Sequence, residues 1–331
     1  MSADTTTLAN ALRPAVDNIP TIARFHNLSL PSKMREAAVI AGVGDIDKPG
    51  TGANAMWNII RGNGNTSRQT FTEGTAAPGA GNQTDAQATL GWIWFRIMCG
   101  ITGIAEDVAR GASYYTDATY GEAGMYGETA LGLRDLFDLV TTTFLGSATH
   151  GLLAAVDDGT TTVTYANNNR VALADLRSYV EPGGGVAVTY AGMNNVREAL
   201  ADTPRGQPAN AWFVPENQRS AVSAIIGIGA AASLVRFTAG QATAGGALVD
   251  AGYGISSMAF DGVPIYSLPG MSTTNILALT MQHWEFRNIR ELREDPQPLI
   301  GDQRKLSQWS TGLTMVCKST RHQAKYTNLL A

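Results

Sequence analysis

The sequence predicts an α+β protein organised around a long hairpin in its C-terminal third. Apolar residues alternate from Met258 to Tyr266 about the step Asp261-Gly262, which predicts two short strands and a tight turn. The apolar run Asn275–Phe286 predicts one long strand. A charged segment, Arg287–Arg304, and a final strand, Gly312–Cys317, complete a hairpin with an apolar base and a charged, projecting tip.

Length and composition limit the possible classes of protein. The 331 residues predict roughly two domains, and only 16% of them are charged while 44% are hydrophobic. We therefore expect much of the surface to face other protein. The 24 basic and 28 acidic residues give a net charge of −4, so no overall field attracts nucleic acid.

The two cysteines and the apolar runs indicate a protein made in a reducing compartment. Cys99 and Cys317 both lie in apolar strand candidates, where small buried side chains are favoured over a disulfide. No basic and apolar leader opens the chain, and its apolar runs are far below the ~20 residues that span a bilayer. We expect a chain that is neither secreted through a signal peptide nor embedded in a membrane.

The first hundred residues predict an extended arm followed by a hairpin. Residues 1–52 are broken by prolines and lack sustained periodicity, which is typical of an arm that needs another surface to order it. Ala55–Arg61 and Leu90–Ile101 are strand candidates, separated by a polar, Gly-rich stretch. In the second candidate, Trp94 and Met98 alternate with apolar residues, so we expect both of its faces to be covered.

A long helix is predicted from about Thr119 to Leu145, with Gly146 as its stop. Its apolar stripe comprises Leu133, Leu136, Phe137, Val140 and Phe144. Its glycines each cost about 1 kcal/mol relative to alanine, so the helix needs tertiary packing, and the glycines permit close approach of another backbone.

Shorter elements are predicted after Gly146. The step Asp157-Asp158-Gly159 predicts a hairpin, and helices are predicted at Val171–Val180 and Met193–Ala201. Ala211–Val214 is a buried strand candidate, Pro215 begins a helix that runs to about Ile226, and the Gly/Ala-rich residues 227–252 predict a loop.

The sequence does not indicate catalytic, cofactor-binding or metal-binding residues. The four histidines are scattered singly, and no G-x-S-x-G, H-E-x-x-H or Cys-x-x-Cys pattern occurs. The pairs Asp157/Asp158 and Glu294/Asp295 are interpreted as solvated turn ends, and Trp92 and Trp94 flank only Arg96, so no basic patch interleaved with aromatic residues is predicted.

Taken in this order, the chain resembles the major capsid proteins of tailed bacteriophages with the Hong Kong 97 fold. The resemblance rests on the FDGVPIY hairpin, the strand ending in W-F-V-P, the Arg/Glu-rich projecting loop and the long helix. It implies six parts: N-terminal arm 1–52; E-loop hairpin 53–103; peripheral domain with spine helix 104–146; axial domain 147–283; peripheral strands and projecting loop 284–314; return to the axial domain 315–331.

The resemblance also implies function and partners. It implies a structural, non-enzymatic subunit of the virion, made in the host cytoplasm, that forms hexamers and pentamers of an icosahedral head around double-stranded DNA. Expected partners are a separate scaffolding protein, a portal and a cement protein. Expected contacts between subunits are Arg68 and Glu73 in the E-loop and, in the peripheral loop, Arg290, Glu291, Arg293, Glu294 and Asp295.

Two other functions are also compatible with this sequence. A cellular nanocompartment shell of the same fold would enclose an enzyme, and an enzyme with a Gly-rich central domain would form a small oligomer with a ligand pocket.

No lysine occurs between Lys48 and Lys305. An E-loop without an amine nucleophile cannot form isopeptide bonds, so the sequence predicts a shell held noncovalently.

Overall fold

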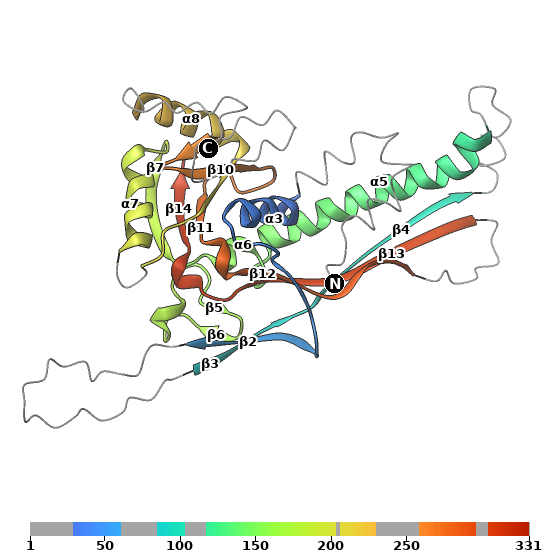
Figure 1. The fold of residues 1–331 in the computed structure, drawn as a ribbon, viewed down its shortest axis with the longest axis horizontal. Coiled ribbons are helices and arrows are strands. Elements are labelled where there is room, and N and C mark those ends of the chain that lie inside the picture. The colour runs from blue at the N-terminus through green and yellow to red at the C-terminus, as the bar shows by residue number, and fades with distance from the viewer. Residues whose placement is uncertain are drawn as a thin grey trace, which may run out of the picture.

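Two separate β-sheets form the framework of the protein. The computed structural model describes residues 29–60, 85–102, 117–202, 206–229, 258–295 and 304–330. One sheet has six strands and the other has four, and two small two-stranded ribbons accompany them. The six-stranded sheet lies at one end of the molecule, and the four-stranded sheet extends away from it beside a long helix (Figure 1).

The six-stranded sheet mixes parallel and antiparallel pairs. Its strands, in spatial order, are β7 (Tyr179–Val186), β14 (Ala324–Leu329), β11 (Ile276–Leu279), β8 (Ala211–Pro215), β10 (Val263–Leu268) and β9 (Met258–Phe260). Helices α7 (Tyr190–Ala201) and α8 (Glu216–Gly229) pack against it, and a core that includes Met193, Val196, Trp212 and Val222 lies between them.

Most local predictions for this sheet are confirmed. Strands β9 and β10 are antiparallel and are joined at Asp261 and Gly262, whose φ angles of 51° and 79° suit a tight turn. Strand β8 is buried along its whole length, and α8 begins directly after Pro215. Part of the predicted loop 227–252 is helical, since α8 continues to Gly229; residues 230–252 lie outside the described residues.

The four-stranded sheet carries the long helix on one face. Its strands, in spatial order, are β1 (Asp47–Pro49), β12 (Trp284–Asp295), β13 (Arg304–Cys317) and β4 (Ile93–Thr102). Helix α5 (Asp117–Gly146) runs beside β4 and β13, and the predicted apolar stripe faces the sheet. Leu133, Leu136, Val140 and Phe144 are buried, and Phe144 contacts the rings of both Phe95 and Phe286.

Glycine permits the closest approach between α5 and the sheet. A Cβ atom at Gly132 would lie 2.3 Å from Cys99 Sγ on β4, far inside normal contact distance. The prediction that helix glycines allow close packing is confirmed at this position.

The described part of the predicted arm is not extended. Helix α3 (Leu30–Ile40) begins at Ser29, whose hydroxyl caps the N–H of Ser32, and it has a proline in its first turn. Leu30 and Met34 are fully buried, and the N–H of Leu30 donates to Thr141 Oγ1 of α5. The arm prediction is wrong for residues 29–40 because the apolar side of this short helix joins the core.

The two strand candidates before α5 form three strands. Strand β2 (Asn54–Ile60) pairs with β3 (Asp85–Gly91), and the chain then passes Trp92 and enters β4. The single predicted strand Leu90–Ile101 is therefore wrong: its start belongs to the ribbon and the remainder to the four-stranded sheet. The residues between β2 and β3 lie outside the described part of the chain.

Two further predictions are corrected. The run Asn275–Phe286 is divided into β11, the 3₁₀ helix η2 (Met281–His283) and the start of β12, because the chain changes sheets there. The predicted helix Val171–Val180 contains only the 3₁₀ helix η1 (Ala174–Leu176) before β7 begins. The predicted hairpin after Asp157 is confined to the short strands β5 (Thr164–Tyr165) and β6 (Asn168–Asn169), which follow helix α6 (Leu152–Ala155).

The junction between the two sheets is a pair of short crossings. The first is η2, and the second is the 3₁₀ helix η3 (Thr320–His322), which connects β13 to β14. The fully buried amide of Gln323 joins them: its Oε1 accepts from Thr280 N–H (2.9 Å) and from Trp284 Nε1 (3.1 Å). Its Nε2 donates to the carbonyls of Thr280 and Ser319.

A buried ion pair fastens the segment before β7 to the six-stranded sheet. Asp157 Oδ2 accepts from Lys325 Nζ on β14 at 2.5 Å, and Asp157 is fully buried. Its Oδ1 accepts from the N–H groups of Gly159 and Thr162. The interpretation of Asp157 as a solvated turn end is wrong, because its partner lies 168 residues later in the chain.

We expect Gly132→Ala to destabilise the protein, although alanine is the better helix former. The added methyl group would overlap Cys99 Sγ, and overpacking of this kind costs about 1–3 kcal/mol. Urea unfolding should show a lower midpoint. Gly146→Ala is the control, since a Cβ there meets nothing within 4 Å. An unchanged midpoint for Gly132→Ala would contradict the packing described.

We expect Asp157→Asn to be strongly destabilising and Asp158→Asn to be nearly neutral. The first change leaves the buried Lys325 ammonium without its carboxylate, a loss of about 3–5 kcal/mol. Burial opposes ionisation of Asp157, but hydrogen bonds from Lys325 and Thr162 outweigh it and lower the pKa.

Because the folded pKa is depressed, the stabilisation is present above the ordinary value of 3.8 and is lost as pH falls through the folded pKa. The difference between wild type and Asp157→Asn in urea unfolding should therefore shrink in acid. A difference that stays constant down to pH 2 would count against this pair.

Candidate assembly surfaces

Within the described residues, part of one face of the four-stranded sheet is uncovered, although the β2–β3 ribbon contacts this face at Arg287. We call it the open face; it lies opposite α5 and carries Trp94 and Met98 of β4, with exposed fractions of 58% and 54%. On the other face of the same strand, Phe95 and Cys99 are buried beneath α5. The expectation that both faces are covered therefore holds for only one of them within this chain.

Trp94 lies across the sheet because its neighbour is glycine. Gly312 of β13 is paired with Trp94, and a Cβ on Gly312 would come within 2.8 Å of both the indole ring and Ile289. Because Gly312 has no side chain, the Trp94 ring packs against β13 at this position. The Trp94 ring is thus packed on one side against β13 while more than half of its surface is exposed.

Charged residues of β12 share the open face. Arg290, Arg293 and Asp295 are paired in register with Gly312, Ser310 and Gln308, and paired residues direct their side chains to the same face. Two register shifts between Asn288 and Arg293 twist the strand here.

Asp295 is the centre of this charged group. Its carboxylate accepts from Ser310 Oγ at 2.5 Å and from Gln308 Nε2 at 3.2 Å, and it forms an ion pair with Arg290. Arg293 Nε is 4.0 Å away and its side chain is 67% exposed. Arg290 is thus held within its own chain, while Arg293 is the arginine of this group with most of its surface open to a partner.

A third arginine comes from β4. Arg96 and Arg293 are both paired with Ser310 of β13, so they flank it on the same face of the sheet. Partial burial, followed by the positive charges of Arg293 and Arg96, lowers the pKa of Arg290. Three arginines and Trp94 therefore meet on one face, which the sequence did not predict because Arg96 is almost 200 residues away from the others. Because Asp295 forms an ion pair with Arg290 and lies 4.0 Å from Arg293, the group is mixed in charge and is not a basic patch.

The remaining predicted contact residues are Glu291, Glu294, Arg68 and Glu73. Glu294 lies on the α5 side of the sheet, where its carboxylate accepts from Ser307 Oγ at 2.7 Å, while Glu291 is exposed. The interpretation of Glu294 and Asp295 as a solvated turn is wrong, because both belong to strand β12 and face opposite ways. Arg68 and Glu73 lie outside the described residues.

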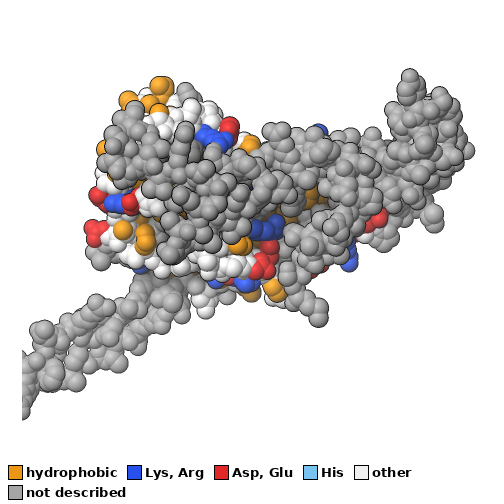
Figure 2. Space-filling view, turned by 45° about the horizontal axis from the view of Figure 1, so that its top comes forward, with side chains coloured by type: hydrophobic (Ala, Val, Ile, Leu, Met, Phe, Trp, Pro, Cys, Tyr) orange, Lys and Arg blue, Asp and Glu red, His pale blue; other side chains and the backbone are white. Residues whose placement is uncertain are grey.

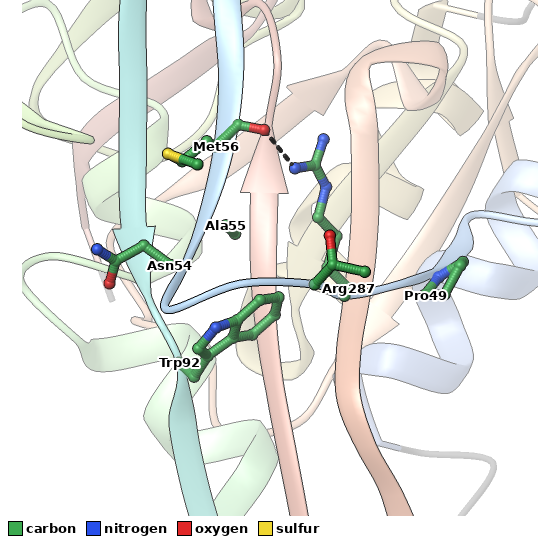
Figure 3. Close-up of a pocket in the computed structure, with 8 residues that line it drawn as sticks. Pro49, Asn54, Ala55, Met56, Trp92 and Arg287 are labelled. Atoms are coloured by element: carbon green, nitrogen blue, oxygen red, sulfur yellow. Dashed lines mark hydrogen bonds between the residues drawn. The ribbon is translucent and has the colours of Figure 1, made fainter.

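Two side chains fasten the β2–β3 ribbon to the sheet. Arg287 of β12 points toward β2 and donates to the carbonyl of Met56 at 2.7 Å (Figure 3). Trp92 Nε1 donates to the carbonyl of Gly52 at 3.0 Å. Between them lies a hollow of about 110 Å³ lined also by Pro49, Asn54 and Ala55.

None of the residues that line this hollow is a Cys, His, Lys, Asp or Glu. Arg287 is its charged residue, and that guanidinium is already bound by Glu285 at 3.0 Å. Within the described residues, no group of three or more His, Cys, Asp or Glu side chains could hold a metal ion. Both cysteines are free and buried.

The described surface has no dominant charge on the face seen in Figure 2, where acidic and basic side chains lie beside one another in small mixed groups. None of the helices in the described ranges is long and apolar enough to cross a membrane.

The fold is that of the capsid subunits of tailed phages, the Hong Kong 97 fold, and the fold prediction is confirmed. The cyanophage A-1(L) capsid asymmetric unit matches with a TM-score of 0.63 and 12% identity, covering 90% of this chain and 93% of that one. The capsid of an empty GTA particle matches with a TM-score of 0.55 and 11% identity, covering 89% of each chain.

A cellular shell protein has the same architecture. The holo-SrpI encapsulin complex from Synechococcus elongatus matches with a TM-score of 0.56 and 9% identity, covering 85% of this chain and 84% of that one. No family model matches the sequence, and no curated protein matches it. At these identities the similarity establishes the fold.

Proposed function

We propose that this chain is a major capsid protein that assembles into hexamers and pentamers of an icosahedral phage head around double-stranded DNA. The observation that carries the proposal is the similarity to the cyanophage capsid subunit over 90% of this chain and 93% of that one. A match of this extent includes both sheets and the long helix rather than one common motif. The role is structural, in the virion, and needs no enzymatic activity.

The two sheets correspond in this proposal to the two domains of a shell subunit. The six-stranded sheet with α7 and α8 is the axial domain, and the four-stranded sheet with α5 is the peripheral domain. The ribbon β2–β3 is the base of the E-loop in this proposal, and Arg287 and Trp92 fasten this base to the sheet.

The open face is where the proposal expects another subunit. Trp94 and Met98 present apolar surface that a soluble single chain would not benefit from exposing, and Arg293 lies beside them. A closed shell places equivalent surfaces of neighbouring copies together, which turns this exposed area into buried interface. Opposite charges at Arg293 would fix the register of the contact more than its strength.

The partners follow from the same assignment. A separate scaffolding protein would direct the curvature of the shell, a portal would occupy one vertex, and a cement protein would add to noncovalent contacts. The enclosed DNA would be contained without sequence-specific binding. Synthesis would take place in the host cytoplasm.

A nanocompartment shell is the second candidate, and the match to the SrpI encapsulin favours it. The two candidates differ in cargo. Particles purified from the natural source would contain DNA if the chain is a capsid protein and a co-purifying enzyme if it is an encapsulin-like shell. Nuclease-protected nucleic acid, measured after external digestion, separates them.

The test of the proposal is electron microscopy of the purified full-length chain. We expect rings of five and six subunits or closed shells in negative stain, and a matching high-mass peak in size-exclusion chromatography. A monomer or small discrete oligomer at all concentrations, with a ligand that raises its melting temperature, would instead favour the enzyme.

We expect the double variant Trp94→Ser/Met98→Ser to fold normally but to assemble poorly. Burying a large apolar side chain contributes about 1.5–3 kcal/mol, and the contact is repeated at every subunit of a shell. Val171→Ser is the matched control, since Val171 is also 58% exposed but lies away from the open face. Shell yield should fall for the double variant alone, with unchanged urea unfolding of unassembled subunits; equal yields would refute an interface here.

A further inference from the structure

Strand β3 has an outer edge, on the side away from β2, and the turn of the β5–β6 hairpin bonds to it (Figure 1). Asn168 Nδ2 donates to the carbonyl of Gln87 at 3.1 Å. The N–H of Thr89, two residues along, donates to the carbonyl of Ala166 at 3.1 Å, and the side-chain amide of Asn167 donates to the Thr89 hydroxyl. Alternate residues of an antiparallel strand direct their backbone groups to the same edge, so the turn follows this edge as a further strand would.

His150 continues this row of contacts. Its Nε2 donates to the carbonyl of Gly91 at 3.1 Å, since a carbonyl oxygen can only accept, and its Nδ1 lies 2.7 Å from the Thr149 hydroxyl. Gly91 is the next alternate residue after Thr89. Three successive groups on the outer edge of β3 are therefore bonded by His150, Ala166 and Asn168, and we call these three bonds the edge contacts.

The same ribbon is held from its other edge and from its apolar face. Arg287 donates to the carbonyl of Met56 on β2, and the Trp57 ring packs against Tyr165 of β5 with ring centroids 6.5 Å apart. Trp57 is only 8% exposed. Apolar packing has no preferred direction, whereas hydrogen bonds along an edge depend on geometry and so fix an angle.

The β5–β6 hairpin is itself firmly attached, which a positioning element requires. The Tyr165 hydroxyl accepts from the N–H of Cys317, the last residue of β13, at 3.0 Å. The fully buried Arg170 donates to the carbonyl of Ala155 at 2.6 Å, and its guanidinium carbon lies 5.0 Å from the centre of the Tyr165 ring. The hairpin is therefore connected to the end of the four-stranded sheet at the junction.

The turn of the hairpin has a backbone conformation that alanine rarely adopts. Ala166 and Asn167 have φ angles of 50° and 63°, as a two-residue type I′ turn requires. Asparagine adopts this region readily, but alanine does so at a cost in free energy. This conformation places the Ala166 carbonyl against Thr89, and the bond formed there helps to hold it.

We propose that the edge contacts set the direction in which the β2–β3 ribbon leaves the subunit, and that Asn168 is the positioning residue among them. Its Nδ2 donates to Gln87 and also to the carbonyl of Ala166 at 3.0 Å, so one side chain joins the ribbon to the turn. Gln87 lies nearer than Thr89 or Gly91 to the end of the ribbon at which β3 begins, where a sideways shift changes the direction most. An edge occupied in this way is closed to strand pairing with another chain at these positions.

The consequence for assembly rests on the proposed function. If the ribbon is the base of the E-loop, the edge contacts decide where that base meets a neighbouring subunit. The tests below therefore begin with the unassembled full-length chain, in which the role of Asn168 does not depend on shell formation.

The first test compares hydrogen exchange in Asn168→Asp and Asn169→Asp. The first change removes the donor and places a carboxylate oxygen against two carbonyls. The second adds the same charge one residue away, but Asn169 Oδ1 accepts from the N–H of Val171 at 2.7 Å, which a carboxylate can also do. Loss of one hydrogen bond of ordinary strength should make exchange of residues 85–91 about fivefold faster in Asn168→Asp alone. Equal exchange in the two variants would overturn the proposal.

The second test measures direction. Cys99 and Cys317 are buried, so spin labels can be attached at Asn58→Cys on β2 and Ala191→Cys on α7, which are both exposed positions. We expect a narrow distribution of label distances in the otherwise unchanged chain and in Asn169→Asp, and a broader or shifted one in Asn168→Asp. Faster exchange with an unchanged distribution would show that Asn168 only stabilises the ribbon, and would refute its positioning role.

Shell yield separates this proposal from the proposed function. If the wild-type chain builds shells, Asn168→Asp should lower the yield and Asn169→Asp should not; equal yields would refute an effect of ribbon direction on assembly. If the wild-type chain builds no shell, the proposed function fails, and the exchange and distance measurements still decide whether Asn168 positions the ribbon.

Discussion

The amide side chain of Gln323 is the contact on which the relation between the two sheets depends. The chain leaves β11 for β12 and returns from β13 to β14 through crossings only a few residues long. A neutral and buried side chain, Gln323, holds these two crossings together. Gln323 accepts from Thr280 and Trp284 on one crossing and donates to Ser319 on the other. A primary amide can do this because it carries acceptors and donors together. The ion pair of Asp157 and Lys325 then fixes the connecting segment to the same region.

Small residues decide how closely the layers approach. Gly132 lets α5 lie against Cys99, and Gly312 lets the Trp94 ring rest on β13. The first produces a tight core on the covered face, and the second produces a flat apolar surface on the open face. One face of the sheet is thus covered by α5, while the other face leaves Trp94 and Met98 exposed. This asymmetry agrees with the proposal that the chain assembles with further copies.

Local patterns in the sequence predicted the fold class, the β9–β10 turn at Asp261-Gly262, the long helix and the buried strand before Pro215. Each of these depends on neighbours along the chain. The prediction was wrong at Asn275–Phe286, because β11 and the first residues of β12 are both buried, so the apolar run continues through the change of sheet. It was wrong at Asp157 because the partner, Lys325, is distant in sequence, and it missed the meeting of Arg96 with Arg290 and Arg293 because strand register is not visible locally. The positions of Arg68 and Glu73 stay predictions.

Strands β12 and β13 also have a mechanical consequence. They are paired without interruption by another element from the junction to Asp295, and both begin or end at the short crossings. At about 3.3 Å per residue, the twelve residues of β12 span roughly 40 Å. A rotation of about 5° at the crossings would displace the far end of the strand pair by roughly 3.5 Å, enough to exchange one set of side-chain contacts for another. A small change at the junction of the sheets would thus be magnified at the far end of β12.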